Sequence, residues 1–293
     1  MEQHRDHQPV KGLLLLATAL LFLATTDAIT KYLTQLLALP VMLAGRYVVS
    51  AVLVVCVFVP RQGLAVTRTR RKGLVLVRSA CLVLSSVAFA SGLKRIGLAE
   101  ATSIVFLGPI LLMFAGKLVL KETIGLLGWA AAALGFGGVL LIVRPGGDVD
   151  MTGALFVVGA SLLSAGYHLL SRSLARTETT VAMLVQANVI GAIAFAAVAP
   201  AYWPAEGLTW PLALILVASG TLSGVGHFML TSAYRYAPAS FLAPGNYVQL
   251  LWAVLLGLAV FGTIPDILAM AGMLAIAAAG LLTAFRARAL RTS

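Results

Sequence analysis

The chain has 293 residues, of which 60% are hydrophobic and only 11% are charged. Soluble domains carry roughly 25% charged and about 45–50% apolar residues, so this composition excludes an ordinary soluble domain and indicates a protein surrounded by lipid. The net charge of +11 does not indicate a nucleic-acid partner, because the basic residues lie at the ends of apolar segments and not along one polar face.

Ten apolar segments follow one another along the chain, separated by Pro, Gly and charged residues. In chain order they cover 12–33, 41–59, 74–93, 99–119, 124–143, 152–172, 180–200, 210–233, 240–261 and 266–285. Most are close to the roughly 20 residues that a transmembrane helix needs. The first segment is too long for the apolar part of a cleaved signal peptide, so we interpret it as a membrane span. The sequence therefore predicts an all-α membrane protein of ten transmembrane helices.

Lys and Arg are distributed unequally between the alternate loops. If the N-terminus is cytoplasmic, fifteen of them lie on the cytoplasmic side and three on the other side. The positive-inside rule then places both termini in the cytoplasm, which agrees with an even number of spans.

The two halves of the chain are weakly similar. A shift of 141 residues places Gly12 on Gly153 and the basic Lys31 on Arg172. Because each half has five helices, the second half would enter the membrane from the opposite side, as in the inverted repeats of many secondary transporters. We therefore expect a cytoplasmic tail at 1–11, repeats at 12–145 and 146–286, and a cytoplasmic tail at 287–293. A monomer is expected because the repeats are fused, with lipid around it and a small-molecule site at mid-membrane between the repeats. A duplicated bundle without transport function is the alternative.

Charged residues inside a span are costly and mark candidate functional sites. Asp27 and Lys31 are one helical turn apart, and they form either an ion pair near the outer interface or part of a substrate site. Arg46 lies early in the second segment. It either pairs with Asp27 or binds a substrate carboxylate.

Histidines and aromatic residues add further candidates for substrate binding. His168 beside Tyr167 is either a ligand to substrate or a core histidine bonded to a backbone carbonyl. His227 and Tyr234 lie on one face of the eighth segment, which forms either a pocket wall or a packing seam.

The ninth segment begins with Pro244 and Gly245, which predict a broken helix near the site. Asn246, Gln249 and Trp252 follow them and offer amide and aromatic contacts to a zwitterion with an apolar tail. The alternative is hydrogen bonding between helices together with an interfacial aromatic side chain.

The motifs of common enzymes and cofactor sites do not occur in the sequence. It contains no phosphate-binding G-x-x-x-x-G-K-[ST] loop, no H-E-x-x-H and no paired C-x-x-C. We therefore predict no cofactor, no metal and no enzymatic activity. A membrane-embedded enzyme is kept as the alternative of a different class.

Several short stretches then occur in a familiar order. They are Lys31, Arg46, Gly108-Pro109 and Glu122 in the first half, and Ala233–Ser240 and Leu242–Trp252 in the second. With these stretches the chain resembles the EamA family of the drug/metabolite transporter superfamily over nearly its full length. It departs from the family at Thr263, where a second acidic residue is common.

The resemblance implies a transporter of small organic metabolites in the bacterial inner membrane. It implies export or exchange, and amino acids, including aromatic ones, are the expected substrates. Drugs, nucleosides or nucleotide-linked compounds and S-adenosylmethionine are the alternatives. Glu122 is expected to cap the fifth helix.

Overall fold

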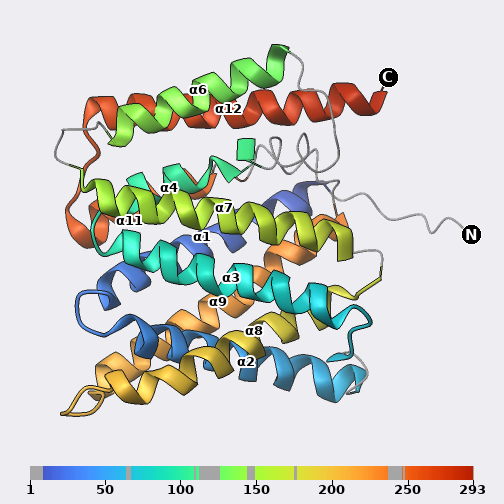
Figure 1. Ribbon diagram of the computed structural model, residues 1–293, viewed down its shortest axis with the longest axis vertical. Helices are drawn as coiled ribbons and strands as arrows, with labels where there is room; N and C mark the ends of the chain where they lie inside the picture. Colours follow the sequence, from blue (N-terminus) through green and yellow to red (C-terminus); the bar gives the residue numbers. More distant parts are fainter. Residues whose placement is uncertain are drawn as a thin grey trace, which may run out of the picture. The chain divides into compact units, whose positions relative to one another are not determined.

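A computed structural model describes residues 9–63, 67–108, 110–111, 126–143, 149–174, 177–236, 246 and 248–292. Within these residues the chain forms ten α-helices and no strand (Figure 1). The helices are α1 (Pro9–Leu33), α2 (Leu39–Gln62), α3 (Lys72–Leu93), α4 (Leu98–Val105), α6 (Leu126–Val143), α7 (Met151–Leu174), α8 (Thr180–Val198), α9 (Trp210–Tyr236), α11 (Val248–Phe261) and α12 (Ile267–Thr292). A 3-10 turn, Ala199–Tyr202, extends α8.

Six of the described helices are long and apolar enough to cross a membrane, namely α1, α2, α3, α7, α8 and α9. Three shorter apolar stretches lie in α6, α11 and α12. Large apolar side chains such as Leu155, Ile193 and Leu274 are more than half exposed on their helices, which is favourable only in lipid. The all-α membrane architecture is confirmed, and the full count of ten spans stays a prediction.

Helix boundaries differ from those expected at three places. The helix expected at 99–119 is interrupted after Val105, and helical residues follow at 108, 110 and 111. Pro109 has no N–H to donate to the carbonyl group of Val105, which accounts for an interruption at this place. The second helix continues through Pro60 to Gln62, where a proline in the last turn costs only one hydrogen bond. The last helix extends to Thr292. Glu122, Pro244 and Gly245 lie outside the described residues.

The chain divides into two compact units, and each unit contains helices from both halves of the sequence. Unit 1 comprises Met1–Ala28, Gly97–Val149 and Val225–Ser293, and unit 2 comprises Ile29–Ile96 and Asp150–Gly224. Two helices, α1 and α9, contribute residues to both units.

In unit 2, α3 packs along α7, and α2 packs along α8 (Figure 1). A glycine allows the first pair to approach closely, since a Cβ on Gly92 would collide with Val157 and lie 2.9 Å from the carbonyl oxygen of Gly153. The second pair buries Tyr47 of α2, whose ring lies against Gly191 of α8 and 5.4 Å from the ring of Phe195. These contacts form the apolar core of unit 2.

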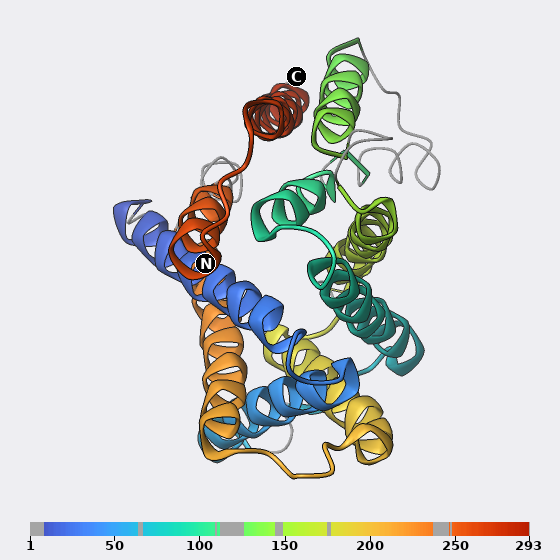
Figure 2. The same ribbon diagram turned by 90° about the vertical axis from the view of Figure 1, so that its left-hand side faces the viewer.

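In unit 1, α6 lies side by side with α12, which can be followed in both views (Figures 1 and 2). A Cβ on Gly138 would lie 2.7 Å from the carbonyl oxygen of Gly272, and a Cβ on Gly272 would lie 2.5 Å from that of Gly138. The first part of α1 packs against the end of α9, where a Cβ on Gly226 would lie 3.1 Å from the Leu23 side chain. In the same unit, α4 packs against α11.

Candidate functional site

Polar side chains gather around the first turns of α11 in unit 1. The amide Nε2 of Gln249 donates to Oδ2 of Asp27 on α1, over 3.4 Å. Trp252, three residues after Gln249 on the same helix, packs with Leu16 and Leu20 of α1 and Ala233 of α9. The structure thus brings together three of the predicted site residues, Asp27, Gln249 and Trp252, within one unit.

Among the described residues of unit 1, two buried polar atoms have no hydrogen-bond partner. They are the indole nitrogen of Trp252 on α11 and the hydroxyl oxygen of Thr102 on α4. Buried hydroxyl groups in helices usually donate to the carbonyl four residues earlier, as Ser103 does to Ala99 over 2.6 Å. Thr102 makes no such bond, although it is only 3% exposed.

Unit 2 contains a buried arginine that the sequence analysis did not select. Arg78 of α3 is 3% exposed. Its Nε donates to Oγ of Ser171 over 2.6 Å, one Nη to the hydroxyl of Tyr167 over 2.8 Å, and the other Nη to the carbonyl of Met183 over 3.1 Å. The guanidinium also lies over the Tyr167 ring, 4.3 Å from its centroid. In the described part of the chain no carboxylate is among its partners.

The remaining predicted residues of unit 2 lie around aromatic rings. His168 meets the ring of Tyr167 edge-on, with centroids 5.1 Å apart. The guanidinium of Arg46 lies 5.3 Å from the ring centroid of Tyr47, and the Tyr47 hydroxyl is hydrogen-bonded to that of Ser86 over 2.8 Å. Tyr167 therefore contacts Arg78 as well as His168, whereas Arg46 contacts the ring of Tyr47 on its own helix, α2.

The end of α7 is fastened to the start of α3 by one carboxylate. Glu178 accepts hydrogen bonds from the backbone N–H groups of Arg70 and Arg71, at 2.9–3.1 Å. These N–H groups stand at the positively polarised beginning of α3. The hydrogen bond from Arg71, followed by that from Arg70, lowers the pKa of Glu178 below its ordinary value.

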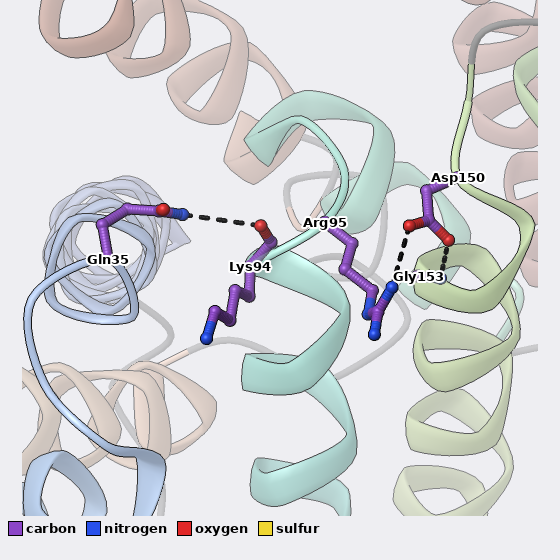
Figure 3. A network of polar contacts seen from close by, with 5 residues as sticks. All are labelled: Gln35, Lys94, Arg95, Asp150 and Gly153. Carbon is purple, nitrogen blue, oxygen red and sulfur yellow. Dashed lines mark hydrogen bonds and ion pairs between the residues drawn. The ribbon is translucent and has the colours of Figure 1, made fainter.

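The opposite end of the same helix pair has a second carboxylate clamp (Figure 3). Asp150 accepts a hydrogen bond from the N–H of Gly153, which caps α7, and forms an ion pair of 3.0 Å with Arg95. The hydrogen bond from Gly153, and then that from Arg95, lowers the pKa of Asp150. Figure 3 also shows Gln35 donating to the carbonyl of Lys94, over 3.4 Å.

Lys31 closes the C-terminal end of α3. Its ammonium group donates to the carbonyl oxygens of Leu93 and Ile96, over 3.0 and 2.6 Å. A cation at a helix C-terminus is favoured by the helix dipole, so Lys31 has a structural task that the sequence analysis did not assign to it.

For the other predicted residues we give only their positions along the helices. His227 lies on α9 with its side chain exposed, and Asn246 stands two positions before Val248, the first residue of α11. The side chain of Tyr234 lies outside the described part. Substrate binding by all nine candidates stays a prediction.

The sequence did carry a signal for Arg78, since it stands six residues inside an apolar helix. Thr102 carried none, because most helical threonines satisfy their own hydroxyl group.

Comparison with known proteins agrees with the membrane architecture. Residues 10–144 match the model of the EamA-like transporter family. The chain is also 34% identical to a riboflavin transporter of Rhizobium johnstonii, over 94% of this chain and 89% of that protein. The chain belongs to the EamA-like transporter family. It is therefore a multi-pass membrane protein of the small-molecule transporter type, as the resemblance predicted.

Other similar proteins fall within the same superfamily. The chain is 25% identical to a riboflavin transporter of Vibrio cholerae, with 88% of each chain covered. It is 25% identical to an S-adenosylmethionine uptake transporter of Rickettsia conorii, over 83% of this chain and 82% of that one. A solved crystal structure matches 96% of both chains with a TM-score of 0.63 and 19% identity, which supports the fold alone. None of these descriptions mentions amino acids, and none supports the enzyme alternative.

Proposed function

We propose that this protein transports riboflavin, or a closely related flavin, across the bacterial inner membrane by alternating access. The observation that carries the proposal is the 34% identity to a riboflavin transporter over nearly the whole of both chains. We thus propose riboflavin as the substrate in place of the amino acids that were expected from the sequence.

The chemistry of the described interior supports a neutral, planar, hydrogen-bonding substrate. Riboflavin has an aromatic ring system with carbonyl oxygens and ring nitrogens on one edge and hydroxyl groups on its side chain. Within unit 1, the described helices offer the aromatic ring of Trp252 and, beside it on the same helix, the amide of Gln249 bonded to the carboxylate of Asp27. Substrate sites commonly combine apolar walls with a few polar groups that orient the ligand.

Matched helix contacts support alternating access through an inverted repeat. In unit 2, Gly92 meets Val157 and Gly153. In unit 1, Gly226 meets Leu23 and Ala19 in the same order. Gly226 lies 134 positions after Gly92, and Leu23 and Ala19 lie 134 positions before Val157 and Gly153. Equivalent packing within each unit, with the roles of the two halves of the sequence exchanged, is what an inverted repeat predicts.

These contacts favour an offset of 134 residues and not the 141 expected from the sequence. The difference of seven residues corresponds to about two helical turns. Gly138 and Gly272, which face each other across α6 and α12, are also 134 positions apart.

Riboflavin flux into proteoliposomes tests the proposal directly. We expect saturable uptake of radiolabelled riboflavin that requires the protein and is inhibited by excess unlabelled riboflavin. Phenylalanine and tryptophan are expected not to compete. Folded protein that moves phenylalanine and leaves riboflavin outside would contradict the proposal.

A second candidate substrate is S-adenosylmethionine, which carries a sulfonium and an ammonium group. Asp27 within α1 offers a carboxylate to a cationic ligand, and the Rickettsia conorii relative is named for uptake of this compound. In the flux assay this candidate predicts competition by S-adenosylmethionine that Asp27→Asn abolishes.

A further inference from the structure

The two polar atoms without a partner in the described part of unit 1 bear on where the substrate is held. A buried polar group without a partner costs free energy, so few persist in folded proteins unless something else binds them. The indole nitrogen of Trp252 and the hydroxyl of Thr102 are both buried, and neither has a hydrogen-bond partner in the described part of the chain. They stand on α11 and α4, which pack against each other.

Both residues stand near the end of a described helix, and helix ends near the substrate are common in transporter sites. The regular part of α4 ends at Val105, one turn after Thr102. At α11, which begins at Val248, Gln249 stands in the first turn and Trp252 one turn later. The beginning of α11 is the positively polarised end of that helix, which attracts the oxygen atoms of a ligand.

Other side chains on α1 and α11 add further donors and acceptors. Trp252 supplies an N–H that can only donate, whereas Thr102 supplies a hydroxyl that donates or accepts. Gln249, bound to Asp27, brings an amide and a carboxylate to the same turns of α11. The complement of these groups is a ring edge with two carbonyl oxygens and an N–H between them.

We infer that Trp252 and Thr102 form a substrate subsite that holds the imide edge of a planar heteroaromatic ring, with Gln249 and Asp27 accepting its N–H. The inference rests on the proposed function, because the pyrimidinedione ring of riboflavin carries this edge. It goes beyond that proposal by placing the ring edge at α4 and α11 within unit 1.

Two substitutions remove the polar atoms and keep the shape. Trp252→Phe deletes the indole N–H, and Thr102→Val replaces the hydroxyl with a methyl group. Each is expected to weaken riboflavin binding by roughly three- to tenfold, the effect of one hydrogen bond. Because each also removes an unpartnered polar atom, the ligand-free protein is expected to keep or gain thermal stability.

Two matched control substitutions are available, one on α4 beside Thr102 and one on α6 in the same unit. Ser103→Ala changes a hydroxyl next to Thr102 that is already bonded to its own helix, and Trp129→Phe changes an indole on α6 that is 49% exposed. Neither is expected to change riboflavin affinity. In addition, 3-methylriboflavin, whose imide nitrogen carries no hydrogen, is expected to bind the unmodified protein at least tenfold more weakly than riboflavin.

Isothermal titration of the protein in nanodiscs, with melting curves of the ligand-free forms, separates the outcomes. If the unmodified protein does not bind riboflavin, the proposed function fails. If it binds riboflavin and both variants bind equally well, the subsite is wrong and the proposed function stands. Lower thermal stability of the ligand-free variants, with the affinity of their folded fraction unchanged, also overturns the subsite.

Discussion

The position of Arg78 shows how an arginine is accommodated inside an apolar helix. A guanidinium has five N–H donors in a rigid plane, and three directions of that plane are met by Ser171, Tyr167 and Met183. The partners are neutral, so the positive charge is stabilised by dipoles and by the face of the Tyr167 ring. Arg78 therefore connects α3 with α7 and α8 at one point.

Replacing Arg78 is expected to destabilise unit 2. Arg78→Met leaves the carbonyl of Met183 without its donor, while relief from burying a charge offsets part of the loss. We expect a net cost of about 1–3 kcal/mol, seen as a lower melting temperature in detergent. Arg78→Lys is expected to lower it too, because an ammonium group cannot span three divergent acceptors. Arg61→Ala, at an exposed position on α2, serves as the control and should change little.

At the scale of the elements, glycines set how closely paired helices approach. Gly138→Ala places a methyl group 2.7 Å from the carbonyl oxygen of Gly272 and must push α6 away from α12. We expect a loss of about 1–3 kcal/mol. The adjacent Gly137 has open space where its Cβ would lie, so Gly137→Ala is a matched control that should be neutral or slightly stabilising. Equal melting temperatures for the two variants would contradict this close approach.

Carboxylates at both ends of the α3–α7 pair make its stability depend on pH. The folded pKa of Glu178 and that of Asp150 are both lowered, so each group stabilises the fold fully above its ordinary pKa of about 4. The stabilisation is lost as the pH falls below 4 through the folded pKa. Melting curves between pH 3 and 7 should show this decline, and Glu178→Gln should make it shallower. Glu206→Gln, at an exposed position in the loop before α9, should leave the curve unchanged.

At the scale of the whole molecule, hydropathy predicted most helices within a few residues because apolar length is a local property. The end of α4 at Val105 was missed although Pro109 is visible in the sequence, since mean hydropathy is insensitive to one missing N–H. The pairing of Gln249 with Asp27 depends on residues 222 positions apart, and no spacing rule predicts it. The register of the proposed repeat is difficult to predict, because apolar helices match each other at several offsets.

The orientation in the membrane is the remaining prediction made from loop charges. After Cys56 and Cys81 are replaced by alanine, single cysteines are introduced at exposed loop positions as Arg68→Cys and Glu206→Cys. Arg68 lies in the arginine-rich loop between α2 and α3, and Glu206 lies in the loop between α8 and α9, the seventh and eighth of the ten expected spans. The positive-inside rule therefore places the two residues on opposite sides of the membrane. A membrane-impermeant maleimide should label Glu206→Cys in intact cells and Arg68→Cys only after permeabilisation. The reverse pattern would show that the protein is inserted in the opposite orientation. Labelling of both positions from outside would contradict the predicted order of spans, on which the inverted repeat depends.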